Sequence, residues 1–194
     1  MAGFGPIGAY PIGSIGPIGI APDHTKPTLV VSSLIIPETQ TNEGLLVKST
    51  SAIWLEVARE FAKDWSRAMD LSPRQWEEMV AGAYERSGYK VVLTPSSGDF
   101  GRDIIASTTG IGSVRILGSV KAYKPGHLVD ADAVRSLIGV VTNDRQASKG
   151  IITTTSDFAP RIQNDPSIAP MLPTRLELMN GEKLQSWLTQ LSAD

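Results

Sequence analysis

Residues 97–106 of the chain read Ser-Gly-Asp-Phe-Gly-Arg-Asp-Ile-Ile-Ala, and residues 114–123 read Val-Arg-Ile-Leu-Gly-Ser-Val-Lys-Ala-Tyr. Each stretch contains a run of apolar and β-branched residues, which favour strands, and the Gly-Ile-Gly at 110–112 is typical of a hairpin turn between them. The pattern predicts strands at 103–107 and 114–123. If these strands pair, Asp103 at the start of the first and Lys121 near the end of the second come close together at one end of a sheet.

Asp103 and Lys121 both need an explanation, because acidic residues are poor strand formers and a lysine ending an apolar strand either extends to solvent or is held for a purpose. Side chains alternate along a strand, so Ser119 is expected on the same face as Lys121. Spacing alone leaves two interpretations open. One is a salt bridge at a sheet edge. The other is a phosphodiester-hydrolysing site, in which Asp103 coordinates a divalent cation and Lys121 acts on the attacking water or on charge developing at the phosphate.

A helix is predicted from Pro73 to Gly88. Ser72 suits the N-cap, Pro73 the first helical position and Gln75 the third, which together form a capping box. Gly88 suits the position just past the helix end. Trp76, Met79, Val80 and Ala83 recur at helical spacing and are expected to be buried.

Strands and helices alternate along the rest of the chain. Further strands are predicted at 89–94, 149–155 and 175–179, helices at 130–143 and 181–191, and a helical turn at 157–163. From residue 73 onward the order is αβββαβ, followed by extra elements. This order favours the α/β class, with a mixed β-sheet core flanked by helices on both sides.

The N-terminal region has a different character. Residues 1–22 repeat Pro-Ile-Gly three times, and so much Pro and Gly cannot form a helix or a central strand. The segment is either a loosely packed tail or an extended arm that docks on a neighbouring subunit. A short β-like run is expected at 28–36, ended by Pro37. Residues 51–71 carry apolar side chains at helical spacing, which predicts an amphipathic helix that covers the core or builds an oligomer interface.

Composition restricts the kinds of site that the chain can build. It has no cysteine and only two histidines, His24 and His127, so thiolate and multi-histidine metal centres are excluded. A metal would be held mainly by oxygen, which favours Mg²⁺ or Mn²⁺. The formal net charge of −2 gives no support to bulk nucleic-acid binding. No apolar run is long enough for a membrane helix and no charged signal-peptide start is present, so a cytoplasmic protein is expected.

Five sequence blocks, in order, resemble the Mrr-like restriction endonuclease domain of the PD-(D/E)XK nuclease superfamily. The resemblance covers about residues 72–191, and it does not extend to residues 1–71. The matching blocks are 72–88, 97–106, 119–123, 149–158 and 176–184. The resemblance implies a restriction-endonuclease-like fold and three units: an arm with a β-like segment at 1–50, a packing or oligomerisation helix at 51–71, and the nuclease domain at 72–194.

By this resemblance, Asp103 matches the metal-binding aspartate, Lys121 the catalytic lysine, and Glu77 the glutamate of an aromatic–Glu pair on the first helix. Helical geometry places Glu77 on the shoulder of the buried stripe, whereas Glu78 is expected to face solvent. The backbone carbonyl of Val120 would complete a Mg²⁺ (or Mn²⁺) site. Ser119 departs from the pattern, because the family has Gln and the superfamily Glu or Asp there, so either the site works with a weaker ligand or activity has been lost.

The implied function is hydrolysis of DNA by a Mg²⁺-dependent endonuclease in defence against foreign or modified DNA. The alternative is a catalytically inactive nuclease-fold module that binds nucleic acid or protein, and a third reading makes the N-terminal arm of an assembly protein the functional part. Lys124, Arg102 and His127 are the candidate DNA contacts, and Asp99 is a turn residue that could support Asp103. Cutting both strands needs two sites, so a homo-oligomer built through the arm and the helix at 51–71 is expected.

Overall fold

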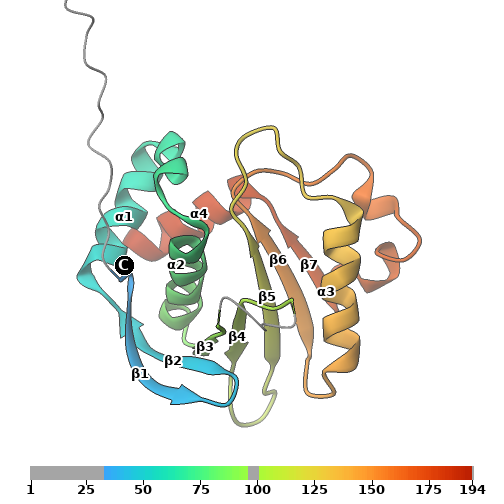
Figure 1. Ribbon diagram of the computed structural model, residues 1–194, viewed down its shortest axis with the longest axis horizontal. Helices are drawn as coiled ribbons and strands as arrows, with labels where there is room; N and C mark the ends of the chain where they lie inside the picture. The colour runs from blue at the N-terminus through green and yellow to red at the C-terminus, as the bar shows by residue number, and fades with distance from the viewer. Residues whose placement is uncertain (1–32, 96–100, 194) are drawn as a thin grey trace, which may run out of the picture.

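A seven-stranded mixed sheet forms the centre of the computed structural model, which describes residues 33–95 and 101–193 (Figure 1). The strand order across the sheet is the order in the chain, with antiparallel pairing from β1 to β5 and parallel pairing from β5 to β7. The strands are β1 (Ile35–Thr41), β2 (Gly44–Thr50), β3 (Lys90–Leu93), β4 (Ile104–Ser107), β5 (Arg115–Lys121), β6 (Lys149–Thr154) and β7 (Leu176–Met179). The predicted α/β class with a mixed sheet is confirmed.

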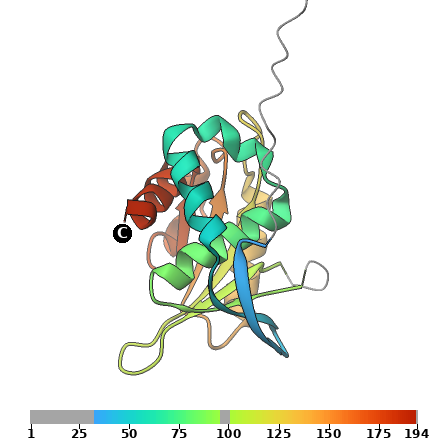
Figure 2. The ribbon, with the colours of Figure 1, turned by 90° about the vertical axis from the view of Figure 1, so that its left-hand side faces the viewer.

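Helices cover both faces of the sheet. On one face lie α1 (Ala52–Lys63), α2 (Pro73–Arg86) and α4 (Gly181–Ala193), and on the other lies α3 (Ala131–Asn143) (Figures 1 and 2). Short 3₁₀ helices span Trp65–Asp70, Ile162–Asn164 and Ala169–Met171. The expected helical turn at 157–163 is therefore confined to its last residues. Neighbouring residues of β5 enter different cores: Ile116 packs with α1, α2 and α4, and Leu117 packs with α3. This confirms the predicted alternation of faces along β5.

The predicted start and end of α2 are confirmed. The Ser72 hydroxyl accepts a hydrogen bond from the Gln75 N–H at 3.3 Å, and the Gln75 side chain accepts one from the Ser72 N–H at 2.8 Å. Gly88 follows the helix with a φ of 86°, a conformation that glycine adopts without strain. These bonds fix where α2 begins, and Glu77 lies one turn further along.

The amphipathic segment at 51–71 is not a single helix. It divides at Asp64, which has extended backbone angles and whose side chain accepts a hydrogen bond from the Ser66 N–H. The apolar stripe is nevertheless buried, because Phe61 stacks on Trp76 of α2 with ring centroids 5.2 Å apart. In the described part of the chain, α1 thus has a packing role.

Of the β-like run expected at 28–36, residues 28–32 lie outside the described part of the chain, and the expected end at Pro37 is wrong. β1 begins at Ile35 and continues through Pro37 to Thr41, and β2 follows it as a strand that the sequence did not predict. Proline is tolerated because β1 is the edge strand, and its register with β2 shifts on both sides of Pro37. Residues 35–50 are therefore bonded into the same sheet as β3 to β7.

The Pro-Ile-Gly repeats lie outside the described residues, and so does Asp99. The division of the chain into an arm, a helix and a nuclease domain stays a prediction. Within the described ranges, no helix is both long and apolar enough to cross a membrane.

Candidate active site

The predicted β4–β5 hairpin is confirmed, and it sets Asp103 beside β5. Ile104 pairs with Gly118, so Asp103, one residue earlier, lies opposite Ser119. The Asp103 N–H donates to the Gly118 carbonyl at 2.8 Å, and the Asp103 carboxylate accepts the Val120 N–H at 2.6 Å through Oδ2. This short hydrogen bond holds the carboxylate against β5. The sequence proposed the Val120 carbonyl as a metal ligand; the structure adds that the N–H of the same residue orients Asp103.

Lys121 is the last residue of β5 and is half-buried. Its main chain is well fixed, because its carbonyl accepts hydrogen bonds from the Thr154 hydroxyl at 2.9 Å and from the Thr155 N–H at 3.3 Å. No ion pair involving Lys121 occurs between residues of the described ranges, so the sheet-edge salt bridge with Asp103 is not formed there. Ser119, two residues earlier, is only 5% exposed.

Glu77 lies on α2 with a side chain that is 16% exposed, and it is paired with Arg74 at 2.6 Å. Arg74 also donates to the Thr94 carbonyl at 2.9 Å, just beyond the end of β3. Glu77 is therefore held near the end of the sheet where Asp103 lies, but its charge is balanced by Arg74. The helical periodicity did not indicate this ion pair between Glu77 and Arg74.

Thr94 links these elements. Its hydroxyl donates to the carbonyls of Arg102 at 2.7 Å and Asp103 at 3.0 Å, and its N–H donates to the Asp103 carbonyl at 3.0 Å. The side chain is almost fully buried. Sequence reasoning missed both Thr94 and Arg74, because a threonine at a strand end and an arginine in a first helical turn carry no distinctive pattern.

Glu78 does not face solvent as expected. Its carboxylate accepts the Leu34 N–H at 2.9 Å and thereby attaches the start of the β1 segment to α2. A partner 44 positions earlier in the chain cannot be read from helical periodicity.

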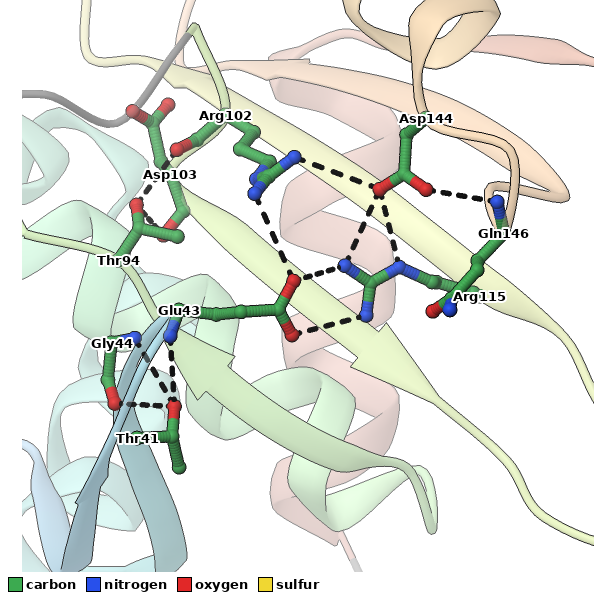
Figure 3. Close-up of polar contacts among 9 residues, drawn as sticks. All are labelled: Thr41, Glu43, Gly44, Thr94, Arg102, Asp103, Arg115, Asp144 and Gln146. Atoms are coloured by element: carbon green, nitrogen blue, oxygen red, sulfur yellow. Dashed lines mark hydrogen bonds and ion pairs between the residues drawn. The ribbon is translucent and has the colours of Figure 1, made fainter.

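The three candidate DNA contacts lie in different environments. Lys124 and His127 are exposed on the loop after β5, where the His127 ring lies against that of Tyr123 with centroids 4.2 Å apart. The Arg102 side chain is only 19% exposed and forms ion pairs with Glu43 at 3.8 Å and Asp144 at 3.6 Å. It points away from the Asp103 carboxylate (Figure 3).

The donor set at this end of the sheet consists of oxygen. Within residues 33–95 and 101–193, no group of three or more His, Cys, Asp or Glu is arranged to hold a metal ion. Mg²⁺, however, is bound in many enzymes through one or two carboxylates, with water in its other positions. Asp103, fixed by the Val120 N–H and facing a buried hydroxyl at Ser119, fits such a site with one firm carboxylate.

Comparison with known protein families shows which family the chain belongs to. The family model described as a restriction endonuclease, the Mrr catalytic domain, matches residues 68–188, which include α2, β3 to β7 and every candidate site residue. The chain belongs to this family. The match begins four residues before the resemblance seen in the sequence and leaves out β1, β2 and α1.

One curated relative of this chain is the uncharacterized protein y4cE of Sinorhizobium fredii (strain NBRC 101917 / NGR234). It is 29% identical over 103 residues, which are 53% of this chain and 26% of that protein. The present chain thus spans about a quarter of the relative's length.

Two solved structures align with most of this chain. The DNA modification-dependent restriction endonuclease AspBHI superposes with a TM-score of 0.50 at 16% identity, over 82% of this chain and 40% of that one. The MspJI restriction endonuclease in complex with a 27-mer oligonucleotide gives a TM-score of 0.49 at 18% identity, over 85% and 36%. The first supports the restriction-endonuclease-like fold, and this chain covers well under half of either protein.

Proposed function

We propose that this domain is a Mg²⁺- or Mn²⁺-dependent endonuclease that hydrolyses phosphodiester bonds of DNA at a site formed by Asp103, Lys121, Glu77 and Ser119. The observation that carries the proposal is the β4–β5 register, which sets Asp103 opposite Ser119. Ser119 stands two residues before Lys121 on β5, and all three residues lie within the matched family region.

Each residue has a separate part. Asp103 would hold the metal, with the Val120 carbonyl and Glu77 as further oxygen donors. When bound, the metal supplies Lewis-acid activation of the phosphate and of water. The Lys121 ammonium, at the end of the strand, orients the attacking water and stabilises negative charge that develops on the phosphate. Ser119 gives a neutral hydroxyl where a carboxylate is common, so the site binds metal more weakly than one with two carboxylates.

Glu77 reaches the metal only if its bond to Arg74 opens or is shared. The pair is partly buried, and Arg74 is also hydrogen-bonded to the Thr94 carbonyl. Arg74 therefore limits the negative charge at the site before DNA arrives. A phosphate group brought by DNA offers Arg74 an alternative partner, which would release Glu77 towards the metal.

A polar surface continues from Lys121 across the parallel strands. Lys121 pairs with Thr154 of β6, and Asn180 follows Met179 of β7 in the next position of the same row, about 10 Å away at the usual strand spacing. Asn180 lines a cavity of about 380 Å³ together with Arg161 and Lys183. These cations, with Lys124 and His127 on the neighbouring loop, support a DNA path over the carboxyl ends of β5 to β7, although the whole chain has a net charge of −2.

The cellular role that we propose is the cleavage of foreign or modified DNA in the cytoplasm, in line with the description of AspBHI as modification-dependent. Cutting both strands of a duplex needs two such sites, so we propose a homo-oligomer assembled through the N-terminal arm and the outer surface of the segment at 51–71. If the arm builds the oligomer, deleting residues 1–22 will reduce the number of subunits, as calculated from the mass measured by light scattering. An unchanged number of subunits would show that the arm is not needed for assembly.

A plasmid-nicking assay of the full chain with Mg²⁺ or Mn²⁺ tests the activity. Asp103→Asn and Lys121→Ala should each reduce the cleavage rate at least about 100-fold, the scale on which single catalytic groups act. Glu56→Gln and Lys48→Ala are matched controls, because both residues are exposed and belong to α1 and β2, outside the proposed site, and they should cleave like the parent chain. Cleavage that survives both site substitutions would disprove the assignment.

The second candidate function is an inactive nuclease-fold module that binds nucleic acid or protein, and Ser119 is the observation that favours it. Ser119→Glu separates the two. If the site is an active one with a weak ligand, this change should lower the Mg²⁺ concentration needed for cleavage; DNA binding without cleavage in either protein would support the inactive module.

A further inference from the structure

Four charged side chains that are far apart in the sequence meet beside the candidate site (Figure 3). Arg115, at the start of β5, donates both terminal nitrogens to the two carboxylate oxygens of Glu43, at 2.5 and 3.3 Å. Its Nε and Nη2 also lie 3.3 Å from one oxygen of Asp144. Arg102 completes the four-charge cluster (Glu43, Arg102, Arg115 and Asp144) through ion pairs with the same two carboxylates.

The cluster is partly shielded from solvent and has no net charge. Burial lowers the pKa of Arg115, but the hydrogen bonds and charges of Glu43 and Asp144 outweigh it and raise that pKa, so the guanidinium stays charged. The Nε of Arg102 is buried and has no hydrogen-bond partner within the described ranges. Asp144 is itself fixed at the end of α3, because its other oxygen accepts the Gln146 N–H at 2.9 Å. The position of Arg102 therefore depends on its two ion pairs.

Glu43 comes from the turn between β1 and β2, and this turn is held in place independently. The Thr41 hydroxyl donates to the Gly44 carbonyl at 2.8 Å and accepts the N–H groups of Glu43 and Gly44 at 3.2 Å. Gly44 lies so close to the end of β3 that a Cβ built on it would be 2.3 Å from the Leu93 carbonyl oxygen. The turn thus packs closely against the backbone of Leu93 and Thr94. The Thr94 hydroxyl donates to the carbonyls of Arg102 and Asp103.

We propose that Glu43 and Arg102 are positioning residues for Asp103, so that the β1–β2 hairpin is a working part of the nuclease site. The side chain of Arg102 is anchored on one side by Glu43 and Asp144, and its carbonyl is anchored on the other by Thr94. The peptide that leads into Asp103 is consequently fixed, and the Asp103 carboxylate stays on the Val120 N–H. This inference rests on the proposed function, and it adds residues from outside the family match at 68–188.

The cluster assigns Arg102 a different role from the DNA contact that the sequence suggested. A guanidinium that neutralises phosphate is usually exposed and free to approach the duplex. Arg102 is 19% exposed and already faces two carboxylates. Its substitution should therefore change the site while leaving the affinity for DNA intact.

Hydrogen exchange at the Val120 amide, measured by NMR on the full chain without metal or DNA, tests the proposal directly. In Glu43→Gln and in Arg102→Met, we expect this amide to exchange about ten-fold faster than in the parent, because the Asp103 carboxylate that covers it becomes mobile. The Val120 amide of the double variant should exchange no faster than that of the faster single variant, since Glu43 acts on Asp103 through its ion pair with Arg102. Arg102→Lys keeps the charge and should restore part of the protection.

Glu38→Gln is the matched control, because Glu38 is an exposed residue of the same hairpin and should leave the Val120 amide unchanged. The amides of β6, on the far side of β5, report on the sheet as a whole. Acceleration of β6 together with Val120 would mean that the cluster only stabilises the fold, and an unchanged Val120 amide would mean that it does not hold Asp103. Either result overturns the proposal.

Cleavage gives a second readout, which separates this inference from the proposed function. Glu43→Gln and Arg102→Met should raise the Mg²⁺ concentration for half-maximal cleavage several-fold and leave the Kd for DNA within about two-fold. A large rise in the Kd for DNA in Arg102→Met alone would make Arg102 a DNA contact and overturn the positioning role. If the parent chain does not cleave at all, the proposed function fails, whereas the exchange measurement still decides whether Glu43 and Arg102 position Asp103.

Discussion

The β1–β2 and β4–β5 hairpins are both antiparallel and belong to one sheet, but different forces hold them. β5 is buried on both faces, with Ile116 in one core and Leu117 in the other. β1 is exposed along most of its length, and its hairpin is joined to the sheet through the pairing of β2 with β3. At its turn, the close approach of Gly44 and the ion pairs of Glu43 add contacts with β3 and with two arginine side chains. The loop of the β4–β5 hairpin extends away from the molecule at the lower left of Figure 2.

A segment can therefore lie outside the region that the family shares and still contact the candidate site. The family match covers the β4–β5 hairpin and omits β1 and β2. The omitted turn nevertheless contacts the backbone of Leu93 and Thr94 and pairs with the residue that precedes Asp103. A nuclease domain cut at residue 68 would lose these contacts.

Gly44→Ala should have the largest effect on stability. The new Cβ would lie 2.3 Å from the Leu93 carbonyl oxygen and 2.9 Å from the Thr94 Cα, at a φ of 145° that L-residues rarely adopt. We expect a loss of about 2–4 kcal/mol in the free energy of unfolding, measured by urea titration. Gly110→Ala is the control, since it also has a positive φ but open space around it, and it should cost about 1 kcal/mol. Equal losses would show that the turn does not press on β3.

Thr94→Val tests the place where the two regions meet, and a smaller effect is expected. The change keeps the shape of the side chain and removes the hydroxyl that donates to the carbonyls of Arg102 and Asp103. The free energy of unfolding should fall by about 1–2 kcal/mol, and cleavage should fall further than that loss explains at a temperature where the chain stays folded. Thr142→Val, at an exposed hydroxyl of α3, should leave cleavage unaltered. Normal cleavage by Thr94→Val would show that the backbone of Asp103 is held without this hydroxyl.

Tyr84→Phe, in the apolar core of the matched region, should have the smallest effect. Burial raises the pKa of Tyr84, assisted by the nearby Glu177 and Tyr89, and its hydroxyl has no hydrogen-bond partner in the described part of the chain. A raised pKa in the folded state gives stability below the unfolded pKa of about 10, and this stability is lost as the pH rises above it. Tyr84→Phe should leave stability at pH 7 within about 1 kcal/mol and reduce its decline above pH 10. A large loss of stability in Tyr84→Phe at pH 7 would contradict this expectation, because it would mean that the hydroxyl makes a hydrogen bond.

The same difference explains what could be predicted from the sequence. The helix from Pro73, the strands around Ile104 and Ile116 and the order of elements follow from apolar periodicity and capping residues, so the fold and the placement of Asp103 on a hairpin were within reach. The extension of β1 past Pro37 was not, because an exposed edge strand has no apolar pattern. β2 was missed because its apolar run, Leu45 to Val47, is short and is followed by polar residues. Partners such as Glu78 with Leu34 and Arg102 with Glu43 depend on tertiary structure, and local sequence does not encode them visibly.

The central claim is that Asp103 binds a divalent cation beside Ser119 and Lys121. A crystal of the full chain soaked in Mn²⁺ tests it most directly, because manganese is located by its anomalous scattering without reference to activity. The claim predicts a peak within coordination distance of an Asp103 oxygen, about 2.2 Å, that disappears in Asp103→Asn. A bound Mn²⁺ elsewhere, or a peak that persists in Asp103→Asn, would contradict it.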